Sequence, residues 1–182
     1  GLGMNIDVFN DRGKPTNKTG ELVCKNPFPS KPIYFWNDKK YKKYKAAYFE
    51  KFTNIWSHGD YVQKTKNGGY IIYGRSDATL NPGGVRIGTG EIYNSVQKFN
   101  WITDCLATGY LIDNDEKVIL FIKSSPKIPN QYDLMIKKHL KSTLSPRHVP
   151  WKIFNVTDIP RTKSGKNSEI LVKKIINNDK VQ

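Results

Sequence analysis

In the first seventy-six residues, apolar and polar positions alternate in short runs that turn-forming residues separate. The run at 20–24 has the period of a half-buried strand, and a segment rich in Asn, Asp, Gly and Pro divides it from the apolar residues before it, which predicts a hairpin. The elements expected here are strands at 7–9, 20–24, 55–62 and 70–73, a Pro-rich loop at 26–32, and a short helix at 45–52 with Tyr48, Phe49 and Phe52 inward. This part is therefore expected to be mostly β.

Beyond residue 76 the apolar spacing changes to the helical period. Apolar residues recur every four positions from Tyr132 to Leu144, which predicts an amphipathic helix that stops before Pro146. Thr89 is expected as the N-cap of another helix, with Glu91 in its first turn. The elements expected here are a helix from residue 89, a hairpin of strands at 104–112 and 117–123, a helix at 131–144, a strand at 152–156 and a short helix at 169–176.

The predicted fold class is α+β. A small C-terminal domain at 77–182, with a three-stranded sheet covered by helices, follows a β-rich part at 1–76. The 182 residues, 37% of them hydrophobic, suffice for one core, or for one small domain and a piece of another. No apolar run is long enough to span a membrane and no signal-peptide pattern is present, so no membrane partner is expected. Cys24 and Cys105 lack metal-type spacing and are expected to be buried thiols of a cytosolic protein.

The chain carries 30 Lys and Arg against 16 Asp and Glu, a net charge of +14 that is typical of nucleic-acid-binding modules. Only five of the thirty are arginine, and the lysines are scattered, so we interpret most of them as solvated surface and expect no nucleic-acid partner. A basic nucleic-acid-binding module remains the alternative from another class. Guanidinium geometry is expected to matter at Arg75, Arg86, Arg147 and Arg161.

Three segments carry candidate chemistry. His58-Gly59-Asp60 fits either a strand-end turn with a capping carboxylate or a ligand-binding carboxylate. The glycine-rich segment at 74–93 fits either a linker with a local ion pair of Arg75 and Asp77 or a phosphate-binding loop, although it is no Walker A loop. The segment at 159–167 has three cations around one glycine and taken alone is a solvated basic loop. The three histidines show no ligand spacing, so hydrolase and metal-site interpretations stay weak.

Taken in order, these segments resemble the late motifs of the adenylate-forming enzymes, the family of the acyl-CoA synthetases. The matching motifs are Gly59-Asp60, Gly74-Arg75-Ser76-Asp77, Gly83-Gly84-Val85-Arg86-Ile87-Gly88 with Glu91-Ile92, and Pro160-Arg161-Thr162-Lys163-Ser164-Gly165-Lys166. Within the family, the chain resembles members that act on acetoacetate. The residues that carry this resemblance are Phe35-Trp36-Asn37-Asp38, Trp56-Ser57-His58-Gly59-Asp60-Tyr61 and Leu144-Ser145-Pro146-Arg147-His148-Val149-Pro150. Acetate or another short acid is the competing substrate. Acyl-pocket residues are absent from the chain.

The resemblance implies nucleotide-binding roles near the domain boundary. Asp60 would bind the ATP ribose hydroxyls, a task suited to an acceptor-only carboxylate, and Arg75 would contact the nucleotide beside it. Asp77 would be the hinge about which the domain at 77–182 swings between two poses. In the first pose Lys166 would stabilise the oxygens of the forming acyl-adenylate, which makes it the catalytic residue.

In the second pose, the resemblance implies a role in CoA binding. Gly83, Gly84 and Val85 would line the pantetheine tunnel, where a side chain at either glycine would narrow the path of the thiol. Arg86, which the resemblance implies is a nucleotide-binding residue, would meet phosphate. The cations expected at the CoA phosphates, with the weakest support, are Lys137, Lys138 and Lys141.

The resemblance also implies that the chain is a fragment. The family's phosphate loop, its magnesium-binding acid and its acyl pocket would lie in a large N-terminal domain, whose last β part is the segment at 1–76. We therefore expect ATP, Mg²⁺ and CoA as ligands of the whole enzyme, no metal ligand in this chain, and the missing N-terminal domain as its partner. A folded remnant without ligands is the other alternative, and it predicts that nucleotides and CoA leave the melting temperature unchanged.

Overall fold

The computed structural model describes residues 3–179 and divides the chain into two compact units, one ending at Asp77 and one beginning at Ala78. Each unit has its own sheet and its own buried side chains. No helix among residues 3–179 is long and apolar enough to cross a membrane.

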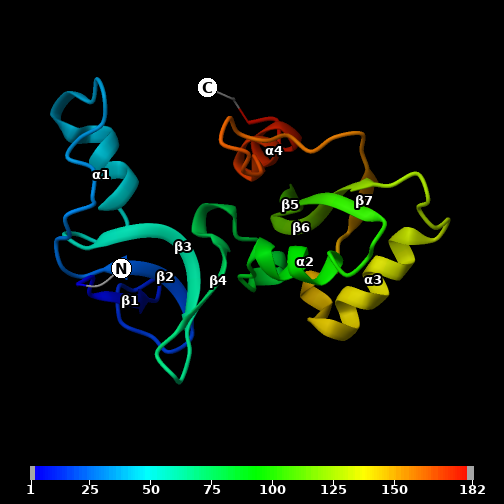
Figure 1. Ribbon diagram of the computed structural model, residues 1–182, viewed down its shortest axis with the longest axis horizontal. Coiled ribbons are helices and arrows are strands. Elements are labelled where there is room, and N and C mark those ends of the chain that lie inside the picture. The colour runs from blue at the N-terminus through cyan, green and yellow to red at the C-terminus, as the bar shows by residue number, and fades with distance from the viewer. Residues whose placement is uncertain (1–2, 180–182) are drawn as a thin grey trace. The chain divides into compact units, whose positions relative to one another are not determined.

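The first unit is built on a four-stranded antiparallel sheet in the order β1-β2-β3-β4, so the expected hairpin and strand pair join into one sheet (Figure 1). Its apolar residues form two small clusters, one around Phe9, Val23 and Phe52 and one around Cys24, Phe28 and Trp56. The elements are β1 (Ile6–Phe9), β2 (Thr19–Cys24), the 3₁₀ turn η1 (Lys39–Tyr41), α1 (Lys42–Tyr48), β3 (Trp56–Lys64), β4 (Tyr70–Arg75) and the 3₁₀ turn η2 (Ser76–Ala78), which ends one residue into the second unit.

The expected helix at 45–52 is wrong at both ends, since α1 starts three residues earlier and ends at Tyr48. The carboxylate of Asp38 accepts hydrogen bonds from the backbone N–H groups of Lys43 (2.9 Å) and Tyr44 (2.8 Å), which satisfies donors of the first turn and starts the helix early. Phe52 lies beyond the helix and packs edge-on against Phe9, so it is buried by the sheet.

The second unit is built on the three-stranded sheet β5-β6-β7, in which β6 pairs antiparallel with β5 and parallel with β7. The turn between β5 and β6 consists of Asp113 and Asn114, both with positive φ, as a tight two-residue hairpin requires. The elements are the 3₁₀ turn η3 (Pro82–Gly84), α2 (Thr89–Val96), β5 (Ile102–Ile112), β6 (Asp115–Ser124), α3 (Tyr132–Thr143), the 3₁₀ turn η4 (Pro146–His148), β7 (Lys152–Asn155) and α4 (Glu169–Ile176).

Helices cover both faces of this sheet (Figure 1). On one face, α2 and α3 bury Ile92, Val96, Ile136 and Leu140 against strand residues such as Leu120 in a single core. On the other face, Val172, Ile175 and Ile176 of α4 line an apolar cavity with Leu106 and Phe121 of the sheet. The predicted three-stranded α+β fold is confirmed.

The helix predicted at 131–144 is confirmed as α3, because Ile136 and Leu140 are fully buried at the expected spacing. The prediction of Thr89 as the N-cap of α2 is wrong by one residue. Gly88 occupies the cap, its N–H donates to the Glu91 carboxylate at 3.0 Å, and Thr89 is already helical. Both cysteines are buried thiols as expected, and burial raises the pKa of the Cys105 thiol to about 12.

Candidate functional site

His58, Gly59 and Asp60 lie inside β3 and form a bulge there, so the strand-end turn considered for them is wrong. Ser57 and Tyr61 pair with Val23 and Glu21, so four residue steps of β3 lie opposite two steps of β2. Gly59 turns the backbone with φ +83°, a conformation that suits glycine. The bulge interrupts the pairing of β3 with β2 at these three residues, while Asp60 stays in register with β4.

The buried carboxylate of Glu21 stabilises the bulge by hydrogen bonding. The Glu21 side chain is 2% exposed, and its two carboxylate oxygens accept hydrogen bonds from the Gly59 N–H and the Lys51 ammonium, both at 2.8 Å. A buried carboxylate is unfavourable without such partners. Through Glu21, the Lys51 ammonium therefore connects the segment after α1 to the bulge.

Arg75, at the end of β4, lies directly across from Asp60 in the sheet. Its guanidinium donates to the Asp60 carboxylate at 3.4 Å, to the His58 carbonyl at 3.2 Å and to the Asp77 carboxylate at 3.4 Å. Partial burial opposes the charged form, but the carboxylates of Asp77, Asp60 and Glu21 together raise the pKa of Arg75. The structure thus brings three predicted residues, Asp60, Arg75 and Asp77, into one ion-pair network.

The space above Gly59 belongs to this network. A Cβ atom at Gly59 would lie 2.5 Å from a terminal nitrogen of Arg75, so only glycine lets the guanidinium rest over the bulge. Asp60 keeps a side chain that is 20% exposed, and Arg75 one that is 51% exposed. A carboxylate acceptor and a guanidinium donor are therefore presented side by side to solvent.

In the second unit, Gly83 and Gly84 form a tight turn, η3, with φ values of +57° and +75°. The Arg147 guanidinium donates to the carbonyls of Pro82 and Gly83, both at 2.9 Å, and the Gly83 N–H donates to the Asp115 carboxylate at 2.8 Å. We call the turn at 82–84, with its contacts to Arg147 and Asp115, the glycine turn.

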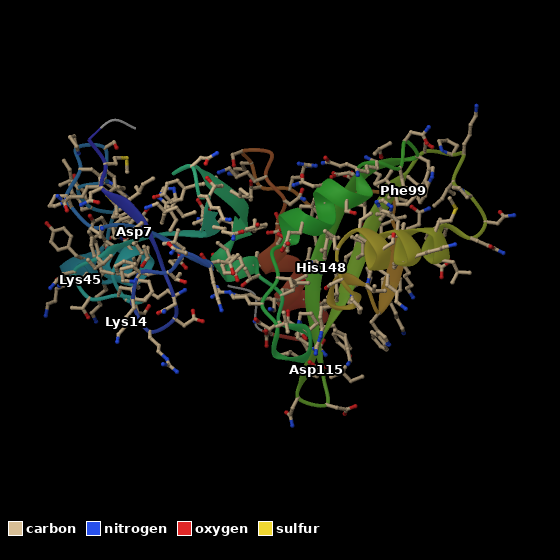
Figure 2. The ribbon with its side chains drawn as sticks, turned by 90° about the horizontal axis from the view of Figure 1, so that it is seen from below. Asp7, Lys14, Lys45, Phe99, Asp115 and His148 are labelled. Carbon is tan, nitrogen blue, oxygen red and sulfur yellow. The ribbon has the colours of Figure 1, made fainter. Side chains whose placement is uncertain are left out.

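Charged neighbours fix the ionisation of Asp115, which Figure 2 labels near the turn between β5 and β6. The Lys117 ammonium at 2.8 Å and the Gly83 N–H hold the pKa of Asp115 down at about 2. The two residues after the glycine turn have different surroundings. The Val85 side chain is 45% exposed, whereas the Arg86 guanidinium donates a hydrogen bond to the hydroxyl of buried Thr79 at 2.9 Å.

Lys166 lies in a closed loop at 161–167, which we call the lysine loop. Arg161 and Asn167 form an isolated β-bridge at its base. Inside the loop the Thr162 N–H donates to the Lys166 carbonyl at 2.8 Å, and the Lys166 N–H donates to the Thr162 hydroxyl at 3.1 Å. The backbone of Lys166 is therefore held, while its ammonium has no hydrogen-bond or ion-pair partner among residues 3–179.

The lysine loop and the glycine turn meet opposite ends of β5. The lysine loop is attached at Asp104 and Cys105, near the start of the strand, through hydrogen bonds from Arg161 and Asn167. The glycine turn is attached at Asp115, just past the end of the strand. Asp115 pairs with Ile112, and the eight residue steps from 104 to 112, at the rise of a strand, separate the two attachments by roughly 25 Å.

The predicted CoA lysines lie apart from these contacts, on α3. The Lys137 ammonium donates to the Trp151 carbonyl at 3.2 Å, while Lys138 and Lys141 are exposed. Of the three, Lys137 alone has a fixed head group.

The sequence did not single out Glu21, Asp104 or Asp115 as parts of these sites. Glu21 gives a signal only for a solvent-facing position, since polar residues of an alternating strand usually face water, and its burial follows from its hydrogen bonds with Gly59 and Lys51. Asp104 and Asp115 carry no such signal, because hydrogen bonds to residues far along the chain assign their roles. No group of three potential metal ligands occurs among residues 3–179.

Comparisons with known proteins identify relatives of the chain, although it matches no protein-family model. It is 50% identical over 179 residues to the acetoacetyl-coenzyme A synthetase of Rhizobium meliloti, which covers 97% of this chain and 28% of the relative. It is 47% identical over 189 residues to the acetoacetyl-CoA synthetase of Caenorhabditis elegans, with 100% and 27% covered. The chain therefore spans just over a quarter of the length of these relatives.

Solved structures agree with the sequence comparison. The acetoacetyl-CoA synthetase from Streptomyces lividans is similar with a TM-score of 0.88 and 38% identity over 96% of this chain and 27% of that one. The anthranilate CoA ligase AuaEII, in complex with anthranoyl-AMP, shares the fold alone, at 21% identity and a TM-score of 0.83 over 97% of this chain and 34% of that one. The chain is a homologue of the C-terminal part of acetoacetyl-CoA synthetases and has the fold of adenylate-forming acyl-CoA ligases.

Proposed function

We propose that the chain provides the nucleotide-binding edge, the hinge and the mobile domain of an ATP-dependent acid-CoA ligase. The enzyme would form acetoacetyl-CoA from acetoacetate, ATP and CoA through an acyl-adenylate. Identities of 43–50% to acetoacetyl-CoA synthetases over nearly the whole chain support acetoacetate over acetate. Because the chain spans about 28% of such a relative, the activity is proposed for a protein that also contains the remaining part.

The network of Asp60 and Arg75 supports the nucleotide-binding role. An ionised carboxylate accepts hydrogen bonds from two vicinal ribose hydroxyls, and Arg75 fixes its orientation from 3.4 Å. The nucleotide phosphates require Mg²⁺ in addition. The magnesium ligands are expected in the part of the relatives outside this chain.

The placement of the two loops on β5 carries the proposal. Two half-reactions at one reaction centre need two sets of groups in turn, and the lysine loop and the glycine turn are separated by the length of a strand. One fixed pose of the second unit cannot present both to the same point. Asp77, the last residue of the first unit, is the proposed hinge between the two poses.

In the first pose a carboxylate oxygen of the acid attacks the α-phosphorus of ATP, and the bond to pyrophosphate breaks. The unpaired Lys166 ammonium would stabilise the charge that develops on these oxygens. In the second pose the CoA sulfur attacks the acyl carbon, and AMP leaves. Gly83, Gly84 and Val85 would line the path of the thiol, with Arg86, Lys137, Lys138 and Lys141 as the candidate phosphate contacts.

A chimeric enzyme tests the proposal. The chain replaces the matching segment of the Rhizobium meliloti synthetase, and acetoacetate-dependent ATP–pyrophosphate exchange and thioester formation from supplied acyl-adenylate are measured separately. Lys166→Ala is expected to reduce the exchange by about 10²–10³-fold, the effect of removing one charge-stabilising group, and to leave thioester formation intact. Equal losses in both half-reactions would contradict the assignment of Lys166 to the first pose.

The isolated chain serves as the companion test. It is expected to give no exchange above background, because most of the site lies elsewhere in the relatives. Turnover by the isolated chain would show that the site is complete within these residues.

A further inference from the structure

Arg161 makes one of two attachments of the lysine loop to the sheet, and Asn167 makes the other. One terminal nitrogen of its guanidinium donates to the Asp104 carboxylate at 2.5 Å, and the other donates at 2.6 Å to the carbonyl of Gly165, the residue before Lys166. A planar fork with fixed donor directions thus spans from β5 to the peptide bond that precedes Lys166.

Asp104 is itself held in place. Its second carboxylate oxygen accepts a hydrogen bond from the Cys105 N–H at 2.9 Å, and its side chain is 20% exposed. Both oxygens of the carboxylate are therefore engaged, which fixes the orientation in which it meets Arg161.

The other end of the loop is attached to the next residue of the same strand. The Asn167 side-chain amide donates to the Cys105 carbonyl at 3.0 Å. The remaining hydrogen bonds of the loop backbone are local, between Thr162 and residues 164–166, and leave its orientation on the domain undetermined. The contacts to Asp104 and Cys105 supply that orientation.

We propose that Asp104 and Arg161 form a positioning pair that aims Lys166 for acyl-adenylate formation and has no part in thioester formation. The inference rests on the proposed function, because it presumes that Lys166 acts in the first half-reaction. The pair touches neither substrate nor the reacting atoms and acts through the backbone at Gly165. Since a displacement of about 1 Å in a catalytic group can reduce a rate by 10²-fold, the orientation of the loop is sufficient to limit the reaction.

The chain offers a matched control in the other unit, at Asp7, which Figure 2 labels. One oxygen of Asp7 accepts from the next backbone N–H, that of Val8, at 3.0 Å, and the other accepts from the Lys25 ammonium at 3.0 Å. The Asp7 side chain is 16% exposed, close to the 20% of Asp104. Asp7→Asn therefore removes an ion pair of the same construction at a place without a proposed role.

The kinetic test uses the chimeric enzyme. Asp104→Asn is expected to reduce ATP–pyrophosphate exchange by 10–100-fold while thioester formation from supplied acyl-adenylate stays within twofold. Asp7→Asn is expected to leave both rates unchanged. In the background of Lys166→Ala, Asp104→Asn should have no further effect on the exchange, because a residue that acts only through Lys166 has nothing left to position. An additive loss in the double variant would overturn the proposal.

A structural readout in the 182-residue chain separates this inference from the proposed function. Asp104→Asn is expected to raise the amide hydrogen-exchange rates of Gly165 and Lys166 by at least tenfold, whereas Asp7→Asn leaves them unchanged. Unchanged exchange rates in Asp104→Asn would refute the pair whatever the enzyme does. Faster amide exchange together with a chimera that forms no acyl-adenylate at all would refute the proposed function and leave the pair as the anchor of the loop.

Discussion

Replacing Gly83 by alanine is expected to destabilise the second unit more than replacing its neighbour Gly84. Both residues have positive φ, so both alanine variants carry the same left-handed backbone penalty of about 1–2 kcal/mol. The surroundings differ. A Cβ at Gly83 would lie 1.6 Å from a terminal nitrogen of Arg147, whereas a Cβ at Gly84 would have no neighbour within 4 Å.

The difference between the two variants follows from what Arg147 loses. Its guanidinium can swing away from the new methyl group, but it then gives up its hydrogen bonds to the carbonyls of Pro82 and Gly83. Two such bonds near the surface contribute about 1–2 kcal/mol together, after discounting for solvent. Gly83→Ala is therefore expected to cost about 2–4 kcal/mol and Gly84→Ala about 1–2 kcal/mol.

Chemical denaturation of the chain, followed through the NMR amide signals of β5 and β6, measures the second unit separately from the first. The comparison is repeated with Arg147→Ala, where both glycine substitutions should cost the same because the clash has been removed. Equal costs of the two substitutions with Arg147 present, or a difference that persists without it, would refute the reasoning.

Two further predictions concern charges that support the sites. Lys117→Met should raise the pKa of Asp115 from about 2 toward 3.8, because the Lys117 hydrogen bond is the main cause of the low pKa. NMR titration of the Asp115 carboxyl group measures the change. An unchanged titration midpoint would exclude that cause. The stability that Asp115 contributes is present above pH 4 and is lost as the pH falls toward 2. In the variant this contribution should be smaller, and its loss should be complete at a higher pH. Glu21→Ala should destabilise the first unit by about 2–3 kcal/mol, because it leaves the Gly59 N–H and the Lys51 ammonium without their buried partner. Glu21→Gln should cost less. Denaturation followed by tryptophan fluorescence measures both variants, and an equal loss of unfolding free energy in the two would contradict the prediction.

Local patterns predicted most elements of the fold, and their failures have local causes. The period of apolar residues placed α3 correctly, because burial of Ile136 and Leu140 decides that helix. The helix α1 was misplaced because its start depends on the Asp38 carboxylate, an interaction that apolar periodicity does not report.

The candidate site shows the same division. The order of motifs selected Asp60, Arg75, the glycine turn and Lys166, and the structure brings Asp60 and Arg75 together across neighbouring strands. It also bends the loop after residue 160, which by composition is a solvated basic loop, back onto β5 through Arg161. Charge alone gave no reason to choose that contact.

The sequence by itself determined the family resemblance, the α+β class and the residue types of the site, because these depend on short motifs and on periodicity within single elements. Only the tertiary structure decided that Glu21 supports the bulge at Gly59, that Arg147 closes the glycine turn and that Asp104 holds the lysine loop. These contacts join residues between 38 and 64 positions apart. Strand pairing brings Glu21 and Gly59 together, whereas Arg147 and Arg161 reach their partners from a turn and a loop outside the sheets. The physical reason is that a buried polar side chain must form a hydrogen bond with whichever group the fold places next to it, and that group can lie anywhere in the sequence.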